Sequence, residues 1–324
     1  MKKPNCLIFV EKGLKGTENQ CLALAKSLGA STQVRHPELR APWRWIAPYF
    51  RSFKHLAYKN ADALFSSPSP DIIIAAGRKS VLAGLEAKKR SQGNSLLIQI
   101  LDPRISSKHF DLVIAPEHDR IKGNNVITIT GALHSITPEF LATHSATQHY
   151  EDLNLLPEPR IAVLIGGSTT KSEFTDKDAK MLGDRLASLS KNEGASLMIT
   201  TSRRTSASQT EILKETLNNT PHFFWDGTGD NPYFDFLSLA SYIFVTNDSV
   251  SMAAEALGTQ KPVYIANIGR QGQRIEEFHS ILNKKNLTKP LGSTLQDWKP
   301  QAGNDMMRVT NEILKRLKDK KIHG

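Results

Sequence analysis

Short apolar runs that are typical of buried strands alternate with helical patterns along almost the whole chain. Near the start, residues 7–10 lead through a glycine-containing turn into a helical pattern at residues 18–28, and residues 71–75 lead into residues 81–90 in the same way. This alternation predicts parallel sheets with helices on both faces. Further strands are expected at residues 95–100, 112–115, 125–129, 161–165, 196–200, 223–225 and 243–245, and further helices at residues 176–190, 210–218 and 233–240.

The length of the chain, 324 residues, exceeds one hydrophobic core of the usual size and indicates two domains. The polar stretch 144–154 and the sequence Pro157-Glu158-Pro159 interrupt the alternation between its two series. We therefore expect an α/β protein with two Rossmann-like doubly wound domains that face each other across a cleft. The expected boundaries are residues 1–155 and 156–324, with the last helix packing back on the N-terminal domain.

The formal net charge of +10 and the isoelectric point near 9.5 favour an anionic partner. Phosphorylated small molecules, an anionic membrane surface and nucleic acid all satisfy this condition, but no nucleic-acid recognition motif accompanies the charge. Cys6 and Cys21 are the only cysteines, which is too few for a disulfide framework and suggests a reducing compartment. The first apolar run is too short for a signal peptide, and no run of about 18 apolar residues occurs, so we expect a cytoplasmic protein.

Residues 243–265 predict a buried strand, a polar turn, a short helix and a second strand. Ser249 suits the N-cap of the helix, Gly258 suits its end, and Ser251 and Glu255 share one helical face. The N-terminus of such a helix favours a phosphate group. Glu255 would lie about 9 Å further along the axis, so its carboxylate can accept hydrogen bonds from a ribose. The alternative interpretation, a solvated helix residue, stays open.

Two further turns follow neighbouring strands of the second series. The sequence Gly166-Gly167-Ser168 lets backbone N–H groups approach an anion, although a pair of glycines is also common in ordinary tight turns. The sequence Ser202-Arg203-Arg204 places two guanidinium groups at the same edge of the sheet, where they suit bidentate contacts with phosphate. A solvated basic loop is the alternative for the second turn.

In the first half of the chain, Gly13, Gly16, Glu18 and Asn19 are expected in a flexible turn that meets an acceptor. That turn lacks G-x-G-x-x-G, which argues against a nicotinamide oxidoreductase. Arg78 and Lys79 follow another strand and suit an anionic acceptor or a leaving diphosphate, unless they form a solvated loop. Four side chains near predicted strand ends or turns are candidates for a general base, and the sequence does not rank them: Glu18, Asp102, His118 and His134.

The sequence Asp176-Lys177-Asp178 matches the D-x-D pattern of metal-dependent transferases. It follows Thr175 at the start of a helical pattern, so a helix N-cap with acidic residues in the first turn explains it better. The histidines show no H-E-x-x-H spacing and no pairing with cysteine. We predict no metal site and no cofactor.

Residues 35–59 mix cationic and aromatic side chains, a composition that suits a bilayer interface. A packed aromatic helix with arginines that reach to solvent is the alternative. The residues concerned are Arg40, Arg44, Arg51, Lys54, Trp43, Trp45, Ile46, Tyr49, Phe50 and Phe53.

Many short blocks along the chain match, in order, the pattern of one protein family. They include Gly16 with Glu18-Asn19-Gln20, Gly77-Arg78-Lys79-Ser80, Asp102-Pro103-Arg104, Glu117-His118-Asp119, Gly131-Ala132-Leu133-His134, Gly166-Gly167, Ser202-Arg203-Arg204-Thr205, Asn231-Pro232-Tyr233, Asp248-Ser249-Val250-Ser251-Met252 and Glu255-Ala256. On these residues the chain resembles a family of GT-B-type glycosyltransferases that includes the plant mitochondrial fission protein of the elongated-mitochondria type. Relatives often carry His where Thr17 stands and Asp where Glu11 stands, so an acid–base role of either position does not carry over.

The resemblance implies a metal-independent transferase that takes a sugar from a nucleoside-diphosphate sugar and delivers it to a membrane-proximal or cell-envelope acceptor. It also implies that Asp248 and Met252 contribute to the substrate site and that Asn231 and Tyr233 shape the cleft. A simple cap at the start of a helix is the alternative for Asn231-Pro232-Tyr233. Such an enzyme would be cytoplasmic, with a peripheral position on the inner face of the membrane as the further expectation. Two other functions stay open: a sugar-nucleotide epimerase of the same fold, and a non-catalytic adaptor like the plant fission factor.

Overall fold

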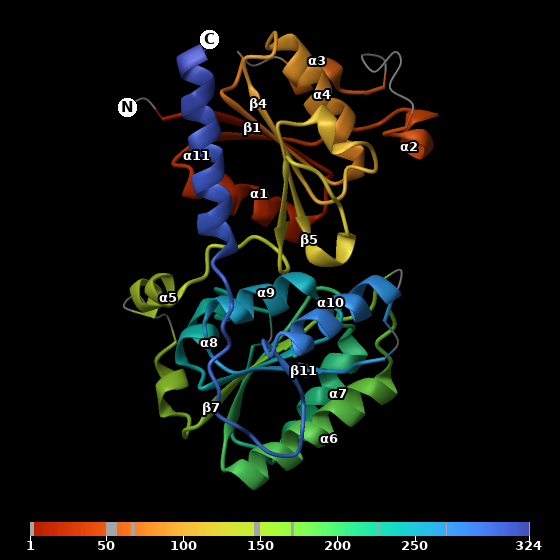
Figure 1. Cartoon of the computed structure of the whole chain (residues 1–324). Coiled ribbons are helices and arrows are strands. Elements are labelled where there is room, and N and C mark those ends of the chain that lie inside the picture. Colours follow the sequence, from red (N-terminus) through yellow and green to blue (C-terminus); the bar gives the residue numbers. More distant parts are fainter. Residues whose placement is uncertain are drawn as a thin grey trace. The chain divides into compact units, whose positions relative to one another are not determined.

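The computed structural model describes residues 3–49, 57–65, 69–145, 150–169, 172–225, 227–269 and 271–323. The chain divides into two compact units, each built on its own six-stranded parallel sheet. The N-terminal unit contains Met1–Ser135 and Asn304–Gly324, and the C-terminal unit contains Ile136–Gly303 (Figure 1). The predicted α/β class with two doubly wound sheets is therefore confirmed.

The sheet of the N-terminal unit has the strand order β2-β1-β3-β4-β5-β6, and every pairing is parallel. Its two faces follow the alternation of side chains along a strand. Cys6, Ile8 and Val10 of β1 pack with α1 and α11, whereas Leu7 and Phe9 pack with α3 and α4. The strands are β1 (Asn5–Val10), β2 (Ser31–Arg35), β3 (Ile72–Ala76), β4 (Leu96–Ile100), β5 (Leu112–Pro116) and β6 (Val126–Ile129). The helices are α1 (Lys15–Ser27), α2 (Trp43–Ile46), α3 (Ala61–Phe65), α4 (Val81–Arg90) and α11 (Asp305–His323), with 3₁₀ turns at Arg78–Ser80, Ser107–His109 and Glu117–Asp119.

The C-terminal helix α11 belongs to the N-terminal unit, where it lies beside α1 (Figure 1). Val309 and Ile313 are fully buried in the core that α1 shares with the sheet. The hydroxyl groups of Ser27 and Thr310 lie 2.7 Å apart, which adds a polar contact between the two helices. The last helix therefore completes one face of the first sheet.

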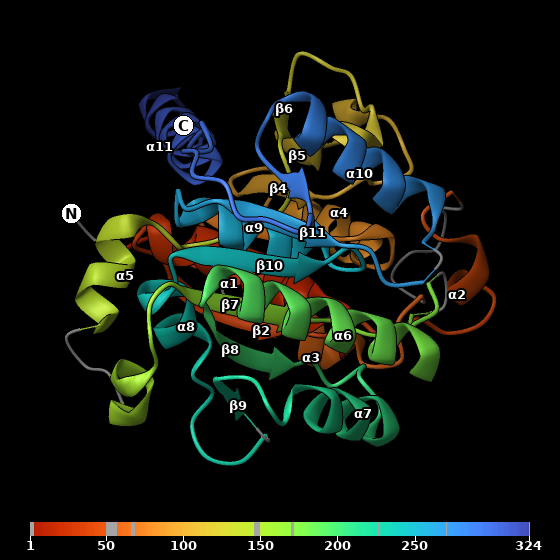
Figure 2. The same ribbon diagram turned by 90° about the horizontal axis from the view of Figure 1, so that it is seen from below.

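The sheet of the C-terminal unit has the strand order β12-β11-β10-β7-β8-β9, again parallel throughout. Val163 and Ile165 of β7 pack against α6 and α7, which lie side by side on one face (Figure 2). Ala162 and Leu164 face the other way and pack with α8, α9 and α10. The strands are β7 (Arg160–Ile165), β8 (Ser196–Thr201), β9 (His222–Trp225), β10 (Tyr242–Thr246), β11 (Val263–Ala266) and β12 (Lys289–Pro290). The helices are α5 (Pro138–Ser145), α6 (Asp176–Glu193), α7 (Ala207–Leu217), α8 (Tyr233–Leu239), α9 (Val250–Gly258) and α10 (Gln273–Lys284), with a 3₁₀ turn at Glu151–Leu155.

The start of the first helix and the boundary between the units differ from the sequence-based expectation. The first helix begins at Lys15 rather than residue 18, because the N–H groups of Thr17 and Glu18 already bond to the Leu14 carbonyl. Residues 136–155, expected in the N-terminal domain, fall in the C-terminal unit, where Leu141 and Leu153 are buried in its core.

No helix in the described part of the chain is both long enough and apolar enough to cross a bilayer.

Candidate functional site

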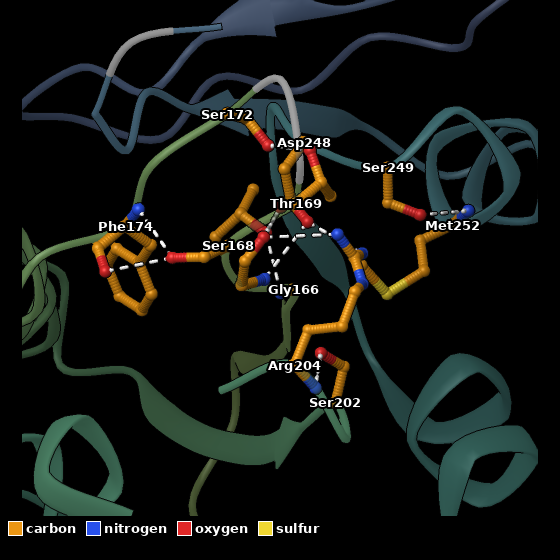
Figure 3. A network of polar contacts seen from close by, with 12 residues as sticks. Gly166, Ser168, Thr169, Ser172, Phe174, Ser202, Arg204, Asp248, Ser249 and Met252 are labelled. Atoms are coloured by element: carbon orange, nitrogen blue, oxygen red, sulfur yellow. Dashed lines mark hydrogen bonds and ion pairs between the residues drawn. The ribbon is translucent and has the colours of Figure 1, made fainter. Parts of the chain in front are cut away.

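Three neighbouring strands of the C-terminal sheet end at the same edge and are followed by polar turns. β7 ends at Ile165, β8 at Thr201 and β10 at Thr246, and β7 pairs with both of the others. Because the strands are parallel, their carboxyl ends lie at the same edge of the sheet. Ligands of open α/β sheets bind at this edge. Figure 3 shows the side chains of these turns converging on Asp248.

Asp248 connects the three turns through its buried carboxylate. Oδ2 accepts a hydrogen bond from the Gly167 N–H at 3.0 Å and forms an ion pair with the Arg204 guanidinium at 2.7 Å. Oδ1 accepts from the Thr246 hydroxyl at 2.6 Å, and the Thr246 oxygen accepts from the Gly166 N–H at 2.8 Å. The side chain of Asp248 has no exposed surface, so both of its carboxylate oxygens are shielded from water.

The two glycines are needed for close packing. A Cβ atom at Gly166 would overlap the Asp248 carboxylate, and one at Gly167 would overlap the backbone of Arg204. The sequence suggested that the N–H groups of this turn approach an anion. The N–H groups of Gly166 and Gly167 instead bond to Thr246 and Asp248, which corrects that part of the reasoning.

The turn after β8 is held against the turn after β7. The Arg204 guanidinium donates to the Gly167 carbonyl at 3.1 Å in addition to its ion pair with Asp248 (Figure 3). The Thr205 hydroxyl donates to the Gly166 carbonyl, and the Ser202 hydroxyl accepts from the Arg204 N–H at 3.1 Å. Arg204 is therefore anchored by these contacts, although it is exposed like the neighbouring Arg203.

Ser168 also has a partner within its own turn. Its hydroxyl accepts from the Phe174 N–H at 3.0 Å and lies 3.3 Å from the Phe174 carbonyl, so it closes the loop that follows Gly167 (Figure 3).

The α9 helix begins directly after this network. The Ser249 hydroxyl accepts from the Met252 N–H at 3.3 Å, which confirms the predicted N-cap (Figure 3). The N–H groups of Val250 and Ser251 lie in the first turn, where a helix has no carbonyl groups of its own to bond them. One face of α9 is buried in the core, and the opposite face is half-buried, including Ser251, Met252 and Glu255.

Glu255 accepts a hydrogen bond from the Tyr233 hydroxyl, with 2.5 Å between the oxygen atoms. Burial raises the pKa of the Glu255 carboxyl above its usual value, and the bond from Tyr233 opposes that shift. Asn231 in turn accepts from the Tyr233 N–H at 3.0 Å, so three predicted site residues form one chain of contacts. Glu255 is therefore not the fully solvated helix residue of the alternative interpretation.

The two cationic candidates of the N-terminal unit, Arg78 and Lys79, both contact residues of that unit. Arg78 donates to the Ala47 carbonyl at 3.1 Å, and Lys79 forms an ion pair with Glu11. These contacts place both side chains at the carboxyl end of the first sheet.

The structure places the predicted acceptor turn on a helix. Gly16, Glu18 and Asn19 lie in the first turns of α1, and Gly13 alone among the glycines of this region has a left-handed backbone, with φ of +90°. Gly16 and Asn19 are exposed. Gly13 lies in the turn before α1, as expected, but the expectation of a turn is wrong at Gly16, Glu18 and Asn19.

The four candidates for a general base lie in the N-terminal unit in different surroundings. Glu18 forms an ion pair with Lys15 at 3.2 Å, and Asp102 forms one with Arg104 at 3.0 Å. His118 is buried, with its Nε2 atom 3.5 Å from Asp119. The fourth candidate, His134, is half-buried after β6.

The D-x-D pattern at the start of α6 is a helix cap. The Thr175 hydroxyl accepts from the Asp178 N–H at 3.2 Å, and the Asp178 carboxylate accepts from the Thr175 N–H at 2.9 Å. This capping box confirms the interpretation drawn from the sequence. Within the described residues, no group of three His, Cys, Asp or Glu side chains is arranged to hold a metal ion.

The basic and aromatic segment 35–59 is described in part. Trp45 and Tyr49 are 68 % and 67 % exposed, and Ile46 of the same turn is 37 % exposed. Arg40 and Arg44 are exposed beside them. Residues 50–56 of the predicted segment lie outside the described residues, and with them four of its cationic and aromatic side chains: Phe50, Arg51, Phe53 and Lys54.

The fold of the chain, with its two parallel sheets, is similar to that of known solved structures. A protein from Listeria monocytogenes described as a UDP-N-acetylglucosamine 2-epimerase superposes with a TM-score of 0.60 at 12 % identity, over 98 % of each chain. A glycosyltransferase from Rickettsia africae superposes with a TM-score of 0.50 at 13 % identity, over 100 % of this chain and 94 % of the other. The chain therefore has the GT-B type of fold.

The family model described as Mitochondrial fission ELM1 matches residues 15–317. The chain belongs to this family. Mitochondrial fission protein ELM1 of Arabidopsis thaliana is 25 % identical to it, over 96 % of this chain and 90 % of the plant protein.

Proposed function

We propose that the protein is a glycosyltransferase that takes a sugar from a nucleoside-diphosphate sugar and transfers it to an acceptor at a membrane surface. The observation that carries the proposal is α9, which begins at the carboxyl end of β10 with a Ser249 N-cap and presents Glu255 on its half-buried face. The first turn of such a helix favours a phosphate group. Glu255 lies about 9 Å further along the axis, within reach of the ribose of the same nucleotide.

In the proposed reaction, the oxygen of an acceptor hydroxyl attacks the anomeric carbon of the sugar. The bond between that carbon and the diphosphate oxygen breaks, and a base accepts the proton of the hydroxyl. Arg203, the remaining N–H groups of Arg204 and the N-terminus of α9 stabilise the negative charge on the departing diphosphate. Because these groups supply positive charge, the reaction needs no metal ion. The candidates for this base are Glu18, Asp102, His118 and His134.

The surface around α2 supports an acceptor at a membrane. Trp45 and Tyr49 are large aromatic side chains with about two-thirds of their surface exposed, and Arg40 and Arg44 are exposed near them. Aromatic side chains favour the level of the lipid headgroups, and arginines are attracted to anionic lipids. The net charge of +10 favours the same surface. The protein would then act as a peripheral protein at the inner face of a membrane.

Two of the similar proteins favour functions other than glycosyl transfer. The experiments described below distinguish these functions from a transferase. The structural neighbour described as a 2-epimerase favours an isomerase that acts on a sugar nucleotide without an acceptor. The plant relative named as a fission protein favours an adaptor without catalysis.

The first test is calorimetric titration with UDP, ADP, GDP and their sugar derivatives. Binding of one nucleoside diphosphate with a micromolar Kd supports the donor site, whereas no binding in the whole panel would favour the adaptor. The sugar derivative of the nucleoside diphosphate that binds is then incubated with the protein, with and without extracted membrane lipids. A glycosylated lipid supports the transferase, and an epimerised donor in the absence of lipid would replace it with the isomerase.

A further inference from the structure

Tyr233 and Glu255 come from two helices that pack on the same face of the C-terminal sheet. Tyr233 is the first residue of α8, and Glu255 lies in the second turn of α9 (Figure 1). The Tyr233 hydroxyl donates to Glu255 Oε2 with 2.5 Å between the oxygens. Both side chains are half-buried, so the contact is partly shielded from water.

The position of Tyr233 is itself fixed by its surroundings. The Asn231 side chain accepts from the Tyr233 N–H at 3.0 Å and so holds the start of α8. The Tyr233 ring packs edge-to-face on Phe234, with 5.6 Å between the ring centroids. A donor held in this way can orient the carboxylate that it contacts.

The bond uses one oxygen of the Glu255 carboxylate. A carboxylate has two oxygens and accepts about four hydrogen bonds, so Oε1 remains available to a ligand. Burial, and then the neighbouring Glu255, raise the pKa of the Tyr233 hydroxyl well above its ordinary value of 10.0, so Tyr233 keeps its proton and remains a donor.

We propose that Tyr233 is a positioning residue that holds the Glu255 carboxylate with Oε1 directed at the ribose hydroxyls, and that this pair makes the site selective for ribonucleotides. The inference rests on the proposed donor site. Tyr233 contacts Glu255 and acts through it. Without the tyrosine hydroxyl, the carboxylate would rotate more freely and would be harder to ionise in its half-buried position.

The C-terminal unit contains a second hydrogen bond from a tyrosine hydroxyl to a carboxylate, which serves as a control for the bond between Tyr233 and Glu255. The Tyr242 hydroxyl donates to Asp297 Oδ1, also at 2.5 Å, and this bond is the first cause that raises the pKa of Tyr242, to about 12. Tyr242 begins β10 at the amino end of the strand, the opposite end from Asp248 and α9. Tyr242→Phe therefore removes the same type of bond without touching the proposed site.

The test compares UDP with 2′,3′-dideoxy-UDP by calorimetry in the wild-type protein, Tyr233→Phe and Tyr242→Phe. The wild type should bind UDP about 10- to 100-fold more tightly than the dideoxy compound. Tyr233→Phe should reduce this ratio to about threefold or less and leave the Kd for the dideoxy compound unchanged, whereas Tyr242→Phe should keep the full ratio. The acid limit of UDP binding should also move to higher pH in Tyr233→Phe.

An unchanged ratio in Tyr233→Phe, or an equal loss of affinity for both compounds, would overturn the positioning role. If the wild type bound no UDP at all, the proposed donor site for this nucleotide would be refuted, and the positioning role of Tyr233 would be refuted with it. Should Tyr233→Phe fail to fold, Glu255→Gln tests the carboxylate through which Tyr233 acts, because the amide removes the charge that strengthens both bonds. It should reduce the ratio in the same direction, and a full ratio in Glu255→Gln would contradict the inference.

Discussion

Replacing Asp248 by Ala should destabilise the C-terminal unit strongly. The change removes the acceptor of the Gly167 N–H and the Thr246 hydroxyl and the counter-ion of Arg204, from a position with no exposed surface. Breaking a buried ion pair on one side costs about 3–5 kcal/mol, and each buried donor without a partner costs about 1–3 kcal/mol. These terms are not additive. Because the Arg204 side chain is 36 % exposed and can reach water, we expect a loss of about 3 kcal/mol in the free energy of unfolding.

The assay is urea unfolding combined with hydrogen exchange at β7 and β8, which reports on the C-terminal unit by itself. Asp184→Ala is the control, because the Asp184 side chain is 55 % exposed and forms an ion pair at 3.1 Å with Lys180 of its own helix. The control should lose less than about 0.5 kcal/mol. A loss below about 1 kcal/mol in Asp248→Ala, or a loss equal to that of the control, would refute the idea that this carboxylate holds the three turns together.

Three other changes give measurable results. Glu255→Ala should weaken UDP binding about 10- to 100-fold, as measured by calorimetry, and unchanged affinity would exclude a ribose contact. It should also lower the free energy of unfolding in urea by about 1–2 kcal/mol, because the Tyr233 hydroxyl loses its acceptor. Burial lowers the pKa of Lys261 from 10.5 to about 8, so the unfolded chain binds more protons than the folded one between these values, and the contribution of Lys261 to stability should rise across that window. The difference in unfolding free energy between the wild type and Lys261→Met, measured at pH 7.5 and pH 10, should therefore grow, and a constant difference would argue against a perturbed lysine. Sedimentation with anionic vesicles should show binding that weakens as salt rises and in the double variant Trp45→Ala and Tyr49→Ala, whereas equal binding to neutral vesicles would contradict the proposed membrane surface.

The fold was largely predictable because its strands are continuous apolar runs between clear turns. β3 (Ile72–Ala76) and β10 (Tyr242–Thr246) are buried on both faces, and such strands differ strongly in composition from the helices around them. β2 (Ser31–Arg35) was not predicted, because it is an edge strand with Val34 as its only apolar residue. α10 was not predicted either, although Ile275, Phe278 and Leu282 show helical spacing in its sequence.

Most residues of the candidate site could be predicted from the sequence, but the contacts between them could not. The sequence placed Gly167, Arg204 and Asp248 at one sheet edge, and the structure brings them together. Their mutual contacts could not be read from the chain, because they join residues about 40 positions apart or more. Thr246 was missed as a member of the network, since a Thr at a strand end has no distinctive pattern. The bond between Tyr233 and Glu255 depends on how α8 and α9 pack, which local sequence does not specify.

The most direct test of the donor site is amide hydrogen exchange with and without a saturating nucleoside diphosphate. If the N-terminus of α9 binds the diphosphate, exchange should slow at Val250 and Ser251, whose N–H groups lie in the first turn. The first turn of α6 is the internal control, because its capping box and its acidic residues Asp176 and Asp178 disfavour an anion. We predict slower exchange at the start of α9 and no change at the start of α6. Unchanged exchange at α9, or equal slowing at both helices, would contradict the proposed site.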